Sequence, residues 1–198
     1  MTDIKTIFGA LAVILTLIGY VPYFRDIFKR TTRPHIFSWF IWGITTGIVY
    51  ALQVSAGGGP GTWVTLVLVL IFVAVFFLSF KHGTKDITKT DIIFLILALS
   101  ALPLWLIVKQ PVLSIILLAT IDILGFIPTI RKSWNDPYSE TLSFYVITTF
   151  RHGITVLALS QYNIITILYP LTWILANATF SLILIARRKK IKPAQKFR

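Results

Sequence analysis

The chain alternates between long apolar runs and short polar connections. The runs are about 17 to 23 residues long, which is the length a helix needs to cross a hydrocarbon core of roughly 30 Å. Helices are expected because lipid offers no partner for open backbone groups, and the period-2 alternation of a barrel strand is absent. The pattern predicts seven membrane-spanning helices, at residues 7–23, 36–56, 63–80, 92–108, 112–130, 142–159 and 164–186.

Composition supports a membrane protein. Hydrophobic residues make up 56% of the 198 residues and charged residues only 13%, whereas soluble domains carry roughly 25% charged residues. These proportions exclude a soluble enzyme, a disordered chain and a secreted disulfide-stapled domain. Because the chain has no cysteine, it has neither a thiolate metal site nor a disulfide.

The basic residues report the orientation of the chain in the bilayer. The net charge is +12, and sixteen of the nineteen Lys and Arg residues fall in the connections 25–33, 81–89 and 131–132 and in the tail 187–198. Only Lys5 and Lys109 lie on the opposite side, and Arg151 lies inside a span. Since cytoplasmic loops are rich in Lys and Arg, we expect the N-terminus outside and the C-terminus in the cytoplasm. The positive charge is therefore explained by the orientation of the chain in the membrane. We expect a lipid bilayer as a partner and do not expect nucleic acid.

Two segments of the chain repeat each other at an offset of 106 residues. Residues 19–25 read Gly-Tyr-Val-Pro-Tyr-Phe-Arg, and residues 125–131 read Gly-Phe-Ile-Pro-Thr-Ile-Arg. Further pairs recur nearby: Ser38-Trp39 with Ser143-Phe144, and Thr62-Trp63 with Thr172-Trp173. We expect a first three-helix repeat over 1–80, a linker helix within 81–110, a second repeat over 111–186 and a basic tail over 187–198. One linker helix gives both repeats the same direction, as in transporters with parallel repeats.

This layout resembles the PQ-loop superfamily, which includes the SWEET and SemiSWEET sugar transporters and the cystinosin-like amino-acid exporters. The motifs that carry the resemblance are Gly-Tyr-Val-Pro at 19–22, Thr-Arg-Pro-His-Ile-Phe-Ser-Trp at 32–39, Gly-Phe-Ile-Pro at 125–128, and Ser143. The glutamine that follows the family's proline is replaced by Tyr23 and Thr129, and spans 36–56 and 142–159 lack the internal proline of SWEETs. The resemblance implies an all-α membrane fold of seven transmembrane helices in a 3+1+3 arrangement, and transport by alternating access.

Ionisable residues inside the spans are the main candidates for function. Asp122 is the only acidic residue within a span, and a charge at that depth costs about 2.5–3.5 kcal/mol on the insertion scale. Arg151 lies at a similar depth in 142–159, with His152 beside it. Two hypotheses remain open: a structural Asp122–Arg151 ion pair, or a proton taken up by Asp122 and coupled to transport. The sequence Asp122-Ile-Leu-Gly125 resembles the cystinosin-like motif whose Asp couples protons.

The remaining candidate residues concern solute contact and motion. The resemblance to SWEETs implies that Asn177 contacts a sugar, with Trp173 on the same face, although an Asn in a membrane helix also serves to join helices. Tyr50 is a candidate for the pathway. For Trp39 and Trp42, interface anchoring is preferred to a place in a gate. In the family, the prolines that correspond to Pro22 and Pro128 act as hinges for a rocking motion. The resemblance therefore makes Pro22 and Pro128 the hinge candidates.

The function expected from the sequence is passage of a small polar solute, either a sugar or, with proton coupling, an amino acid. A non-transporting receptor or scaffold of the same architecture is the alternative, and an intramembrane enzyme ranks third. His35, His82 and His152 show no metal-ligand spacing, and residues 57–61 form a turn and not a phosphate loop. We therefore expect no cofactor and no metal. The oligomeric state stays open, with a homo-oligomer among the alternatives.

Overall fold

The computed structural model describes residues 3–30, 34, 36–83, 89–135, 137–138 and 140–191, without the side chains of residues 90, 91, 127, 128, 131 and 132. His35, several of the counted basic residues and the side chain of Pro128 lie outside this part. The helices are α1 (Ile4–Phe28), α2 (Ile36–Ser55), the 3-10 helix η1 (Gly59–Thr62), α3 (Trp63–His82), α4 (Lys89–Leu106), α5 (Pro111–Asn135), α6 (Leu142–Leu157) and α7 (Ile164–Lys190). No strand occurs in the described residues.

All seven predicted helices are present, but several extend beyond the apolar runs. Helix α1 begins three residues early because Asp3 caps it, with the carboxylate accepting from the Lys5 N–H at 3.2 Å. Asn163 caps α7 through a reciprocal capping box with Thr166, and α7 continues into its basic last turn. Capping groups satisfy N–H donors that the helix leaves open, so they and not hydrophobicity set these ends.

Four segments in the described residues are long and apolar enough to cross a membrane: Ile4–Phe28, Ile36–Ser55, Gly59–His82 and Ile164–Lys190. Helices α4 and α5 contribute shorter apolar stretches, Ile92–Leu106 and Pro111–Phe126. Helix α6 has only 16 residues and contains Arg151 and His152. Several long apolar helices are typical of an integral membrane protein, which confirms that part of the sequence-based prediction.

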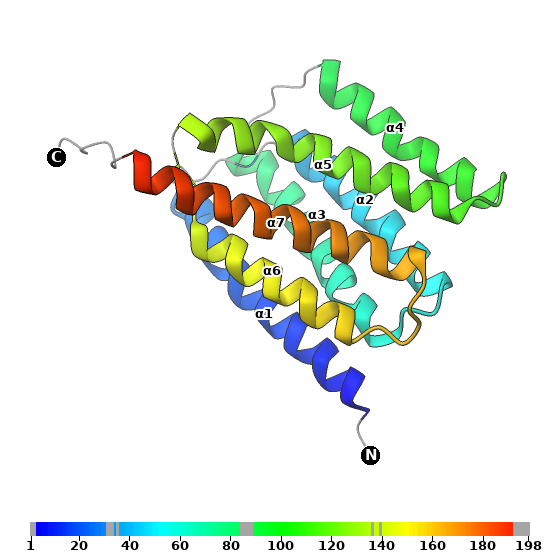
Figure 1. Ribbon diagram of the computed structural model, residues 1–198. Coiled ribbons are helices and arrows are strands. Elements are labelled where there is room, and N and C mark those ends of the chain that lie inside the picture. The colour runs from blue at the N-terminus through cyan, green and yellow to red at the C-terminus, as the bar shows by residue number, and fades with distance from the viewer. Residues whose placement is uncertain are drawn as a thin grey trace.

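The helices pack in the same order in both halves of the chain. Helix α3 packs against both α1 and α2, and α7 packs against both α5 and α6 (Figure 1). The halves meet where α1 contacts α6 and where α2 contacts α5 and α7, while α4 lies against α5 and α2. If α1, α2 and α3 are matched to α5, α6 and α7, each helix contact within the first half has a counterpart in the second half. The contact of α1 with α6 between the halves then corresponds to the contact of α5 with α2.

The apolar core divides along the length of the bundle. We call the end where α1 and α7 begin the N end and the end where α7 finishes the C end, which lie right and left in Figure 1. Near the C end each half has its own cluster, one around Ile27, Trp39 and Val75, the other around Phe180 and Leu184. Near the N end one cluster joins α2, α4, α5 and α7, and a second joins α1 and α3 to Ile154 of α6. The two halves thus share apolar cores mainly towards the N end.

Backbone contacts also connect the halves at the N end. The Ser160 N–H donates to the Gly58 carbonyl at 3.0 Å, and Asn163 Nδ2 donates to the Ala56 carbonyl at 3.1 Å. Gly59 has φ +59°, and a Cβ on Gly61 would lie 2.5 Å from Leu159 Cδ2 and 2.9 Å from its backbone. The glycine segment predicted as a turn therefore does form a connection, and its glycines permit close approach to the α6–α7 connection.

Candidate functional site

Asp122 lies near the middle of α5 and is buried, with 4% of its surface exposed. Its Oδ2 accepts a hydrogen bond of 2.7 Å from the hydroxyl of Tyr169 in α7. Thr45 of α2 is a further polar neighbour of the carboxylate, and Oδ1 has no hydrogen-bond partner among the described residues. We name Asp122, Tyr169 and Thr45 the acidic centre. Its side chains come from α5 and α7 of the second half and from α2 of the first half.

A second polar cluster lies where α6 meets α1. Arg151, His152 and Thr16 are 6%, 4% and 2% exposed, and we name them the basic centre. Arg151 Nη1 donates to Thr16 Oγ1 at 3.3 Å, and Nη2 lies 2.8 Å from His152 Nε2. Because a guanidinium only donates, His152 Nε2 accepts, and the tautomer assigned from this geometry carries its proton on Nδ1. That Nδ1 has no partner among the described residues.

Of the two hypotheses for Asp122, the structural ion pair with Arg151 is wrong. Among the described side chains the one ion pair joins the exposed Arg25 to the half-buried Asp26, at 2.9 Å. Asp122 faces α7 and α2, whereas Arg151 faces α1, so the two occupy different interfaces at similar depth. Tyr169 relates the two centres, since it is bonded to Asp122 and also lies within electrostatic range of the Arg151 guanidinium. The proton-uptake hypothesis for Asp122 remains.

Asn177 and Trp173 lie together on α7, as expected from their spacing. Asn177 is buried, and its Nδ2 donates to the Trp173 carbonyl at 2.7 Å. One amide donor is therefore bonded within its own helix. The Trp173 ring meets those of Tyr169 and Phe126, with centroids 6.4 and 5.8 Å apart. Trp173 thus connects Asn177 to the acidic centre.

The other candidates lie away from these two centres. Tyr50 is half-buried on α2, one turn from Thr46. Pro22 is exposed within an uninterrupted α1, and the side chain of Pro128 is outside the described residues. Trp39 is not an interface anchor: it is buried in an aromatic cluster near the C end, where its ring lies 5.3 Å from that of Tyr23.

Three residues of the two centres were not among the sequence candidates: Tyr169, Thr45 and Thr16. All three lie inside apolar runs, so an inventory of every hydroxyl within a predicted span would have found them. Their partners depend on which helix faces which, and spacing along one helix does not carry that information.

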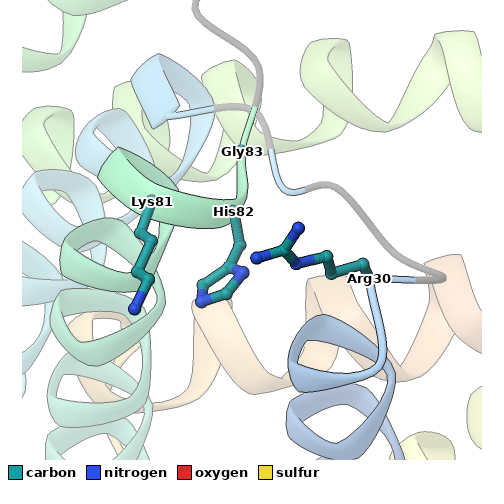
Figure 2. Close-up of a pocket in the computed structure, with 4 residues that line it drawn as sticks. All are labelled: Arg30, Lys81, His82 and Gly83. Atoms are coloured by element: carbon teal, nitrogen blue, oxygen red, sulfur yellow. The ribbon is translucent and has the colours of Figure 1, made fainter.

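A basic pocket of about 210 Å³ opens at the C end, lined by Arg30, Lys81, His82 and Gly83. Figure 2 shows the Arg30 guanidinium pointing towards the His82 ring. Arg30 and Lys81 lie where α1 and α3 finish, so their positive charges complement the negative ends of the helix dipoles. In the described part of the chain no three His, Cys, Asp or Glu residues are grouped as a metal site.

No family model, curated protein or solved structure matches the chain significantly. The resemblance to the PQ-loop superfamily therefore depends on the sequence motifs quoted above.

Proposed function

We propose that the protein is a membrane transporter that moves a small polar solute by alternating access. Its two units are α1–α3 and α5–α7, which correspond to the repeats expected over 1–80 and 111–186 and extend a few residues past both. Helix α4 is the linker helix, and all seven helices cross the bilayer. The observation that carries the proposal is the burial of Asp122 and Arg151, two ionisable side chains, together with Asn177 inside the helix bundle. Ionisable groups at such depth are expensive and mark solute or ion pathways.

The division of the apolar core supports a rocking motion between the units. Shared clusters near the N end and separate clusters near the C end leave the units more independent at the C end. One ring contact still joins them there, between Tyr20 and Phe144, at 6.2 Å. Breaking this contact while keeping the N-end contacts would admit a solute from the C end. The positive-inside distribution assigns the C end to the cytoplasm.

Within this proposal Asp122 is the proton-coupling residue. Its Oδ1 is unpartnered in the described structure and is available to take up a proton, while Tyr169 holds Oδ2. The charged and titratable groups that bear on it are Tyr169 of α7 and, through Tyr169, Arg151 of α6. We expect Asn177 and Trp173, which lie on α7 between Asp122 and the C end, to line the approach once the units separate there.

The test is uptake by proteoliposomes that contain the purified protein. Sugars and amino acids are supplied with and without a pH gradient. Counterflow without a gradient identifies a facilitator, and uptake only with a gradient identifies proton coupling; either result supports the proposal. Absence of flux for the whole panel contradicts transport and favours the receptor or scaffold.

Pro22→Ala is expected to slow solute exchange several-fold while changing solute binding little. Proline removes one backbone hydrogen bond and loosens the helix at that point, so alanine stiffens α1 where the units must bend. Exchange rates in counterflow and affinities from thermal stabilisation provide the two measurements. Pro103→Ala, inside the linker helix α4, is the matched control. Equal effects of Pro22→Ala on exchange and on binding would assign Pro22 to static packing.

A further inference from the structure

The Arg151 guanidinium has no anionic partner in the described structure. Its hydrogen-bond partners are the Thr16 hydroxyl and the neutral His152 ring, and the groups that act on it electrostatically are the phenols of Tyr20 and Tyr169. The only other buried charged residue of the described structure, Asp122, bonds to Tyr169 instead. The basic centre therefore carries a buried positive charge without a counter-charge.

Such an arrangement is costly unless something binds to it. Buried charges in proteins are normally paired, and a buried charge left without a partner is strongly destabilising. A leucine at position 151 would avoid this cost. The presence of Arg151 is therefore explained by function and not by stability. Arginine presents several N–H donors in a planar fork that matches the two oxygens of a carboxylate. His152 adds one more donor, the unpartnered Nδ1–H.

We propose that the transported solute carries a carboxylate group and that Arg151 binds it, with His152 Nδ1 as a second donor. This inference depends on the proposed transport function and narrows its substrate to organic acids, amino acids included, and away from neutral sugars. A single cation with neutral neighbours matches a singly charged carboxylate better than a phosphate dianion. The acidic centre keeps its separate role, because Tyr169 already occupies one Asp122 oxygen.

The test compares carboxylates with their uncharged amides. Thermal unfolding of the purified full chain in detergent is followed with acetate, lactate and succinate, with acetamide, lactamide and succinamide, and with glucose, all at equal ionic strength. A ligand that binds the folded state raises its stability. We expect at least one carboxylate to raise the unfolding midpoint by about 3 °C or more, and its amide to leave the midpoint unchanged.

Variants of Arg151 connect the effect to the basic centre. Arg151→Gln is expected to remove the carboxylate-specific shift, whereas Arg25→Gln, which removes the same charge from an exposed residue, retains it. If Arg151→Gln does not fold, Arg151→Lys preserves the charge without the fork and is expected to bind about tenfold more weakly. Equal shifts with acid and amide, no shift with any carboxylate, or an unchanged shift in the Arg151 variant each overturn the inference.

Counterflow separates this inference from transport itself. Glucose counterflow without counterflow of any carboxylate would support transport and overturn the carboxylate site. Specific carboxylate binding without any counterflow would support the site and contradict transport.

Discussion

Asp122→Asn is expected to abolish uptake driven by a pH gradient and to leave solute counterflow in place. Asparagine has nearly the same shape, and its carbonyl oxygen can accept the Tyr169 hydrogen bond that now ends on Asp122 Oδ2 at 2.7 Å. The amide cannot take up and release a proton, so the coupling is lost while the packing of α2, α5 and α7 is kept. Proteoliposome uptake, with the solute side made progressively more acidic, is the measurement. The wild type is expected to accumulate more solute as that side is acidified, and the variant is not.

Asp26→Asn provides the matched control for Asp122→Asn. It removes a carboxylate that is paired with Arg25 on the surface of α1, and it is expected to keep the dependence on the gradient. Thermal unfolding of both variants verifies that they fold. If uptake by Asp122→Asn depends on pH as it does in the wild type, Asp122 has no part in coupling.

The two centres together account for how a solute and a proton can share one site. Tyr169 bonds to Asp122 and lies within electrostatic range of Arg151. A change of charge on Asp122 therefore alters the environment of the phenol, and through it that of the guanidinium. A carboxylate on Arg151 would supply the counter-charge that the basic centre lacks. Proton and solute would then be linked without a direct Asp122–Arg151 ion pair.

The seven helices could be predicted from the sequence because each apolar run is long enough to identify. Their ends were less accurate: α1 begins three residues before its apolar run because Asp3 caps it, and α7 continues four residues past its apolar run into a basic last turn. The burial of Asp122, Arg151 and Asn177 was also predictable, because polar groups in membrane helices avoid lipid. Depth alone suggested that Asp122 and Arg151 pair, but a pair needs the same direction around the bundle as well as the same depth. That direction depends on helix packing, which placed Tyr169 beside Asp122 and Thr16 beside Arg151.

Gly61→Ala is expected to weaken the contact between the two units at the N end. An added Cβ would lie 2.5 Å from Leu159 Cδ2 and 2.9 Å from the Leu159 backbone, and backbone cannot move aside as a flexible side chain can. Overpacking of this kind costs about 1–3 kcal/mol. If that cost falls on the conformation closed at the N end, the population of N-end-open molecules rises about tenfold for each 1.4 kcal/mol.

Because the chain contains no cysteine, a single introduced thiol can report this opening. Thr155 is buried on α6, one turn from Arg151 towards the N end, and its hydroxyl donates to the Arg151 carbonyl. In a Thr155→Cys background, Gly61→Ala is expected to raise the rate of maleimide labelling from the N-end side about tenfold or more. Gly47→Ala, where an added Cβ meets nothing within 4 Å, is expected to leave the rate unchanged. Equal labelling rates in the two variants would show that the Gly61–Leu159 approach does not hold the N end closed.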